Sequence, residues 1–440
     1  NYYNDLNNYY NDLNNYYNDL NNYYNDLNNY YNDLNNYYND LNNYYNTILS
    51  LNSMSYFFMP QVNNIIQTDN IELQIGTTHK IICKSLYYYL NLMKQQIDNC
   101  IISWDIYKKY TNTYEYIHTV IPYTRQSVCK LKPLSRSFYK LIEISNLLHI
   151  MDAFNNNKQI TTFHLAEGPG GFIEAIKLLR HNNNDIYYGM TLIDKNDNIP
   201  GWKKSKTFLS KFSNIIIETG EDNTGDLFNV NNLWYCYNKY KGTMDLITGD
   251  GGFDFSVDFN KQEIISTKLI FCQICFALAM QKKGGIFILK IFDIFTEASI
   301  DLLYILSSLY EKIIIIKPFT SRLANSERYI VCKNFKLDDS YSIIKRFSNL
   351  FPIINSDDQI KRFLNIEIPY IYINKLEDIN AIIGQQQLEN ILSTLYLLDN
   401  NKQDKLDTIK KNNIQKCIQW CIKYKLPYNI NIQQLNVFLT

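Results

Sequence analysis

Apolar and polar positions follow two alternating patterns through the middle of the chain. Short runs of β-branched and aromatic residues, typical of buried strands, are separated by stretches whose apolar residues recur every three or four positions. We expect strands at Thr161–Ala166, Tyr187–Ile193, Asn214–Glu218, Asp245–Thr248, Gly285–Ile291, Lys312–Lys317 and Tyr329–Lys333. We expect helices at Ser137–Ile150, Phe172–Arg180, Gln262–Gln281 and Glu297–Leu309. This alternation favours a parallel, doubly wound α/β sheet.

The last two expected strands are joined by an unusually short connection. Only PFTSRLANSE, residues 318–327, lies between them. A parallel crossover needs about a dozen residues or more, so we expect the last strand to insert antiparallel. The pattern therefore predicts a seven-stranded sheet with one reversed strand.

The flanking regions have other patterns. Residues 1–46 are six copies of NYYNDLN followed by NYYN. Their richness in Asn and Asp favours a low-complexity tract that is poorly ordered or self-associating, although the spacing of Tyr and Leu also fits a coiled-coil helix. We expect residues 47–130 to be a mostly helical lead-in. Residues 341–440 are expected to form a helical appendage, with amphipathic runs at Gln387–Asn400 and Ile414–Tyr424.

The charge distribution and the cysteine positions add little to this fold prediction. The 43 basic and 43 acidic residues balance, but six Asp fall in residues 1–46, which contain no Lys or Arg. The remainder is mildly basic, which is compatible with an RNA partner. Cys272 and Cys275 form a C-x-x-C inside the apolar run LIFCQICFALAM, where a buried helix is the better interpretation than a redox or zinc site. Cys417 and Cys421 are one helical turn apart and are expected in a core as well.

The cysteine pattern indicates reduced thiols and therefore an intracellular protein, either cytoplasmic (in a viral factory or virion if the protein is viral) or nuclear. We find no signal peptide and no apolar run of transmembrane length, so no membrane contact is expected.

A glycine-rich turn follows the Thr161–Ala166 strand. It reads EGPGGF, and Gly168, Gly170 and Gly171 allow the backbone to turn sharply and to approach a ligand closely. The N–H groups at the start of the next helix would point at that ligand. The turn lacks the Lys-Ser/Thr of a P-loop and the spacing of a dinucleotide fingerprint.

Ionisable residues stand where strands of this sheet would end. Asp250 follows the fourth expected strand, Lys290 closes the fifth and Glu327 precedes the seventh, while Lys140 lies on the helix before the first strand. Ligands of open α/β sheets bind at the carboxyl ends of strands. Taken singly, Lys140 and Glu327 are better explained by a salt bridge or a solvated end, and Lys290 is evenly balanced between that and a functional role.

Five motifs taken in order resemble one family. SRSFYKLIEI, LAEGPGGF, DLITGDGGF, ILKIFDIFT and SRLANSERYIVC look like the FtsJ/RrmJ-like RNA ribose 2′-O-methyltransferases, and most like the mRNA-cap branch of eukaryotes and large DNA viruses. The resemblance covers about residues 131–335 and implies a methyltransferase domain at 131–340. It implies a Rossmann-like fold whose seventh strand is antiparallel, S-adenosyl-L-methionine as cofactor, and a tetrad of Lys140, Asp250, Lys290 and Glu327.

The resemblance also implies roles for individual residues. Lys290 would be the general base and Lys140 a nearby cation that positions the substrate, with Asp250 and Glu327 orienting the two ammonium groups. Gly168, Pro169, Gly170, Gly171 and Phe172 would cradle the methionine end of the cofactor, which Asp250 would also help to bind. Asp226 would bind its adenine, although it fits an ordinary loop or helix-capping role equally well. Asp194 and Asp197 are alternatives for binding its ribose.

The sequence predicts the RNA-contacting residues less specifically than the tetrad and the cofactor site. Basic residues that flank the motifs and could meet phosphates are Arg136, Lys203, Lys204, Lys206, Arg322 and Arg328. Trp202, Phe138 or Tyr139 could stack on a base. For the lysines a solvated face, and for the aromatic residues core packing, is the favoured interpretation.

The sequence thus predicts an enzyme with a capped-mRNA substrate. Two alternatives stay open, namely the same chemistry on rRNA or tRNA and an inactive RNA-binding scaffold. Self-association through the repeats, and contact with other capping or transcription proteins, are expected as partner interactions.

Overall fold

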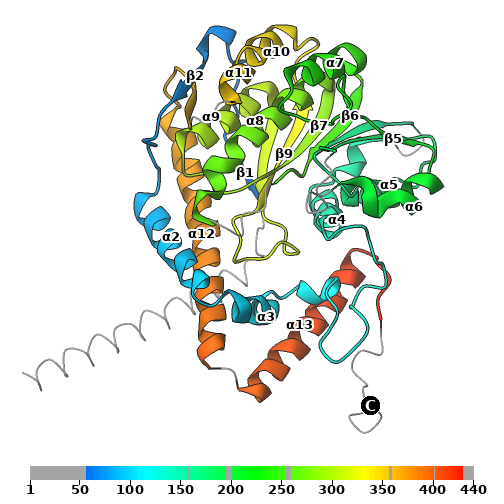
Figure 1. Cartoon of the computed structure of the whole chain (residues 1–440), viewed down its shortest axis with the longest axis vertical. Helices are drawn as coiled ribbons and strands as arrows, with labels where there is room; N and C mark the ends of the chain where they lie inside the picture. The colour runs from blue at the N-terminus through cyan, green and yellow to red at the C-terminus, as the bar shows by residue number, and fades with distance from the viewer. Residues whose placement is uncertain are drawn as a thin grey trace, which may run out of the picture. The chain divides into compact units, whose positions relative to one another are not determined.

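A computed structural model describes residues 56–155, 158–193, 201–252, 259–355, 359–400 and 402–429 (Figure 1). They belong to one compact unit, Tyr56–Thr440. The NYYNDLN repeats, Asp194 and Asp197 lie outside the described residues.

The centre of this unit is an eight-stranded sheet in the order β1-β8-β9-β7-β6-β3-β4-β5. Its strands are β1 (Tyr56–Phe58), β3 (Thr161–Leu165), β4 (Ile186–Met190), β5 (Ile215–Ile217), β6 (Met244–Gly249), β7 (Gln281–Ile291), β8 (Tyr310–Ile316) and β9 (Arg328–Phe335). Strands β3 to β7 pair in parallel, and β9 inserts antiparallel between β7 and β8. The seven predicted strands and the reversed last strand are confirmed. The eighth strand, β1, pairs antiparallel with β8 and was not predicted.

Both faces of this sheet are covered, because successive side chains of a strand point to opposite sides. On β7, Phe287 and Leu289 join one core cluster, and Ile286 and Ile288 join another. The first cluster contains residues of α7 (Val230–Tyr240), α8 (Gln262–Met280) and α9 (Glu297–Leu309). The second contains residues of α4 (Ser137–Leu147), α5 (Gly171–Arg180) and α13 (Gln403–Lys423). The result is the helix–sheet–helix layering that the alternating pattern predicts (Figure 1).

Helix α8 corrects one expectation. It is long and apolar enough to cross a membrane, whereas no such run was expected. Of its most apolar stretch, 83% is buried inside the unit, and Cys272 and Cys275 are completely buried. A helix that packs on all sides needs apolar residues all round, so its place in the core accounts for the composition.

The regions before and after the sheet are largely helical but also contain strands that were not expected. Strand β2 (Ile71–Ile75) pairs antiparallel with β10 (Ile360–Leu364) in a separate two-stranded sheet. Helices α2 (Lys84–Asp98) and α3 (Ile101–Thr111) pack on the long helix α12 (Tyr370–Asp399), and α13 contacts the short helix η2 (Glu115–Ile117) (Figure 1). The other α-helices of the described residues are α6 (Lys206–Lys211), α10 (Tyr341–Ser348) and α11 (Phe351–Ile354). Cys417 and Cys421 of α13 are buried, as predicted.

Candidate active site

The topology brings the four ionisable residues of the expected tetrad to one edge of the sheet. Asp250 follows the last residue of β6, and Lys290 is the penultimate residue of the neighbouring strand β7. Strand β9 runs the other way, with Tyr329 paired to Lys290. Glu327, directly before β9, therefore lies at the same edge as the carboxyl ends of β6 and β7.

Helix α4 supplies the fourth residue and holds the β8–β9 loop. Arg136, at the N-cap of α4, and Lys140 and Glu143 are spaced four and three residues apart and so lie on one helix face. The Arg136 guanidinium donates to the backbone oxygen of Thr320 at 3.3 Å. The Glu143 carboxylate accepts the N–H groups of Phe319 (2.7 Å) and Thr320 (3.1 Å). This face therefore fixes the loop that carries Glu327.

The tetrad is arranged as two ion pairs. Lys140 Nζ lies 2.6 Å from Glu327 Oε1, and Lys290 Nζ lies 3.3 Å from Asp250 Oδ1. Lys290 Nζ also donates to the backbone oxygen of Asp250 at 2.6 Å. Each of these side chains is only about a tenth exposed. A Cβ at Gly252 would stand 3.3 Å from Lys290 Nζ, so the glycine leaves room for the ammonium group.

Residues that the sequence analysis did not single out complete the pairs. The Tyr329 hydroxyl donates to Asp250 Oδ1 at 3.0 Å, and the Ser321 hydroxyl donates to Glu327 Oε1 at 2.8 Å. Lys317 Nζ donates to the backbone oxygens of Asn325 (2.6 Å) and Glu327 (2.8 Å). Ser321 and Tyr329 lie inside the SRLANSERYIVC motif, which was the available signal for them, and Lys317 lies four residues before it.

Burial and the neighbouring charges move the protonation equilibria of the site. Burial would raise the pKa of Glu327, but the Lys140 and Lys290 ammonium groups, with hydrogen bonds from Lys140 and Ser321, lower that pKa to about 2. Burial lowers the pKa of Lys140. The Glu327 and Asp250 carboxylates oppose this shift, whereas the positive charges of Arg136 and Lys290 add to it. Burial and Arg328 lower the pKa of Lys317 to about 7. Glu327 is therefore ionised at neutral pH and confers one negative charge on the site.

The glycine turn after β3 has the backbone that its sequence predicts. Gly170 has φ +104°, a conformation that residues with a Cβ rarely adopt. A Cβ there would also stand 3.4 Å from the Trp202 ring. Trp202 thus packs against the turn, in agreement with the packing role that the sequence analysis favours for it. The N–H of Phe172 is bonded to the Glu167 carboxylate, and the Phe172 ring is buried in the core near Tyr329. The other oxygen of this carboxylate, Oε2, is buried and has no hydrogen-bond partner among the described residues.

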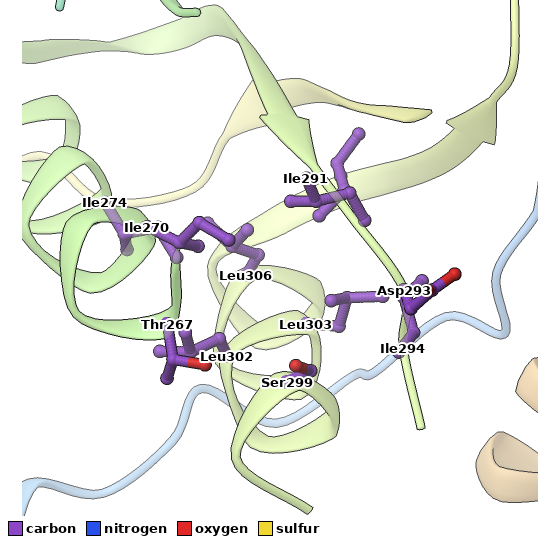
Figure 2. A pocket seen from close by; sticks show the side chains of 11 residues that line it. Thr267, Ile270, Ile274, Ile291, Asp293, Ile294, Ser299, Leu302, Leu303 and Leu306 are labelled. Carbon is purple, nitrogen blue, oxygen red and sulfur yellow. The ribbon is translucent and has the colours of Figure 1, made fainter. Parts of the chain in front are cut away.

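Asp226 lies in the loop after β5, at the rim of an open cavity of about 690 Å³. Its carboxylate accepts the N–H of Phe228 at 2.9 Å, a local hydrogen bond of the kind that an ordinary loop Asp makes. Lys268 and Asn355 also line the cavity. Figure 2 shows another cavity, enclosed by α8, α9 and β7, whose volume of about 10 Å³ is too small for a ligand.

The residues proposed to contact RNA separate into groups. Arg328 is completely buried, where it donates to Asp293 (2.9 Å) and Asn380 (3.1 Å), so its expected phosphate contact was wrong. Phe138 and Tyr139 are buried, in agreement with core packing. Lys203, Lys204 and Lys206 are exposed, as expected of a solvated face. Arg136 and Arg322 remain partly exposed beside the tetrad.

Within the described ranges, no group of three or more His, Cys, Asp or Glu could hold a metal ion.

Part of the chain is similar to known proteins. Residues 133–335 match the FtsJ-like methyltransferase family. Cap-specific mRNA (nucleoside-2′-O-)-methyltransferase 1 of Homo sapiens is 35% identical over 213 residues, which cover 46% of this chain and 25% of that protein. Cap-specific mRNA (nucleoside-2′-O-)-methyltransferase 2 of Pongo abelii is 26% identical over 375 residues, covering 82% of this chain and 46% of that protein. The chain thus spans less than half the length of these curated relatives.

Among solved structures, the fibrillarin of Aeropyrum pernix in complex with S-adenosyl-L-methionine is 13% identical, with a TM-score of 0.30. The match covers 48% of this chain and 85% of that one.

Proposed function

Because residues 133–335 match the FtsJ-like methyltransferase family, we propose that the chain is an S-adenosyl-L-methionine-dependent RNA 2′-O-methyltransferase that acts on the 5′ cap region of mRNA. The observation that carries this proposal is the meeting of Lys140, Asp250, Lys290 and Glu327 as two ion pairs at the carboxyl edge of β6 and β7. The cap assignment rests on the names of the relatives, which are cap-specific mRNA methyltransferases.

The residues at the end of β3 fit the cofactor. Gly170 has no Cβ, so a ligand can approach the backbone closely at this edge. Gly168 to Gly171 would hold the methionine end, and Asp226 would hold the adenine. When bound, S-adenosyl-L-methionine supplies a methyl group on a sulfonium, which a nucleophile can displace.

In the reaction that we propose, a ribose 2′-oxygen attacks the methyl carbon. The carbon–sulfur bond breaks as the carbon–oxygen bond forms, and the 2′-hydroxyl proton passes to Nζ of Lys290, which must first have released a proton to solvent and be a neutral amine. Asp250 holds that nitrogen in place, and the Tyr329 hydroxyl holds the Asp250 carboxylate. Lys140 lies 2.6 Å from Glu327, where it would position the hydroxyl and, in its charged form, favour the developing oxyanion.

Methyl transfer from labelled cofactor to matched RNAs tests this function. The RNAs are a capped transcript, the same transcript uncapped, a structured RNA, and a capped transcript with 2′-deoxyribose at the acceptor. We expect label on the capped transcript alone. Label on the 2′-deoxy transcript would refute ribose 2′-O-methylation, and label on structured but not capped RNA would refute the cap assignment.

A further inference from the structure

Two arginines beside the tetrad share one buried carboxylate. Glu115, in η2, accepts Nη2 (2.7 Å) and Nε (3.0 Å) of Arg322. Nη2 of Arg136 lies 3.7 Å from the same carboxylate. The Thr119 hydroxyl donates to Glu115 Oε1 at 2.9 Å. This group is called the Glu115 arginine pair below.

The pair carries more positive than negative charge. Burial would raise the pKa of Glu115, but the hydrogen bonds from Arg322 and the charges of both arginines lower it to about 2, so it is ionised. Burial and Arg136 lower the pKa of the adjacent His118 to about 3, so this imidazole is neutral. Two guanidinium groups therefore face one carboxylate, leaving an excess of one positive charge. A purely structural bridge to Glu115 would need only one arginine.

The excess charge is accessible. Both arginine side chains are 28% exposed, whereas the Glu115 side chain is 1% exposed, so the carboxylate lies beneath the guanidinium groups. Among the described residues, Nη1 of neither arginine makes a hydrogen bond. Donors thus remain for a further acceptor.

The pair is joined to the tetrad by two short stretches of chain. Arg136 precedes Lys140 by one turn of α4, a rise of about 6 Å. Arg322 lies in the same loop as Glu327, whose ion pair with Lys140 links this loop to α4. A ligand on the guanidinium groups would therefore lie close to a ribose placed at Lys290.

We propose that the Glu115 arginine pair binds one phosphodiester of the substrate RNA, next to the ribose that is methylated. This inference rests on the proposed function. A phosphodiester carries one negative charge, which balances the excess, and its two oxygens match the fork of donors that guanidinium groups present. Glu115 acts as a positioning residue, because its buried carboxylate fixes both arginines without touching the RNA. The contact selects the register of the strand and not its sequence.

Neutralising single phosphates tests the inference. A series of capped oligonucleotides, each with one uncharged methylphosphonate linkage, is titrated against wild type and Arg322→Gln in the presence of S-adenosylhomocysteine. In wild type, one linkage beside the acceptor ribose should weaken binding about tenfold. In Arg322→Gln, affinity for unmodified RNA should already be about tenfold lower, and that linkage should cause little further loss. Equal losses in the two proteins would overturn the proposal.

Two further variants distinguish a lost RNA contact from a general loss of folding. Arg322→Lys keeps a cation for Glu115 but removes the fork, and it should show an intermediate dependence on that linkage. Arg362→Gln is the matched control, since Arg362, on β10, makes a similar two-point bond to Asp301 of α9 (2.8 and 2.9 Å). Arg362→Gln should be less stable than wild type, but each methylphosphonate linkage should weaken its RNA binding by the same factor as in wild type. Failure of the proposed function would appear separately, as absent methyl transfer by wild type on unmodified capped RNA.

Discussion

Nζ of Lys290 donates a 2.6 Å hydrogen bond to the backbone oxygen of Asp250 and lies 3.3 Å from Oδ1 of the same residue. One residue thus holds the lysine through both its main chain and its side chain. The main-chain contact depends only on the turn after β6. The side-chain contact depends on the orientation of the carboxylate, which Tyr329 also contacts at 3.0 Å.

Replacing Tyr329 by Phe should therefore slow methyl transfer without weakening substrate binding. The ring still fills its completely buried site, but the Asp250 carboxylate loses one of its two partners and fixes Lys290 less firmly. Loss of a hydrogen bond worth about 1 kcal/mol corresponds to roughly a fivefold fall in kcat. The KM for RNA and the calorimetric affinity for S-adenosyl-L-methionine should not change. A fall in affinity with kcat preserved would contradict the positioning role.

Glu327 makes stability depend on acid pH. Its folded pKa of about 2 lies below its ordinary value of 4.5, so the stabilisation is complete above about pH 4.5 and is lost as pH falls towards 2. Glu327→Gln should lower the free energy of unfolding at pH 7 by on the order of 3 kcal/mol. In urea unfolding experiments, the difference between wild type and variant should shrink as the pH falls from about 4.5 towards 2.

Glu143 provides the control for that experiment. It lies on the same helix face, but burial raises its pKa above the ordinary value. The difference in unfolding free energy between wild type and Glu143→Gln should not shrink as the pH falls from 5 to 3. If both variants converge with wild type on the acid side, the effect does not come from the Lys140–Glu327 pair.

The glycine turn after β3 allows a paired test of the cofactor site. Gly170 (φ +104°) and Gly242 (φ +64°) both have backbone that disfavours a Cβ, but a Cβ at Gly242 would meet nothing within 4 Å. Alanine at either position should cost about 1–2 kcal/mol of stability. Only Gly170→Ala should also weaken binding of S-adenosyl-L-methionine in calorimetry. Equal cofactor affinity in the two variants would place the cofactor away from this turn.

The sequence predicted those parts of the fold that have a regular pattern of their own. The strands from β3 to β9 are long or apolar enough to be predicted from local sequence, and the short connection before β9, residues 317–327, required its reversal. Strand β1 has only three residues, and β2 finds its partner β10 almost 300 residues later. Pairings of that kind depend on tertiary contacts that no local pattern contains.

The same distinction applies to the site. The order of the motifs was enough to predict that the four tetrad residues meet, because the carboxyl ends of parallel strands lie at one edge of the sheet. Arg328 could not be told from a surface arginine, since its partners Asp293 and Asn380 come from other parts of the chain. Glu115 was passed over because the arginine that it binds, Arg322, is 207 positions away. Charge partners across such distances become visible only in the folded chain.

The central claim is that Lys290 takes the proton from a ribose 2′-hydroxyl. Lys290→Arg tests it most directly, because a guanidinium keeps the positive charge and can pair with Asp250 but does not lose a proton in proteins. The measurement is single-turnover methyl transfer to capped RNA at saturating RNA and cofactor, with Lys290→Ala alongside and cofactor binding checked by calorimetry. We predict that both variants bind S-adenosyl-L-methionine and transfer almost no methyl group. If Lys290→Arg keeps most of the wild-type rate, Lys290 is not the base and the tetrad acts only as an electrostatic clamp.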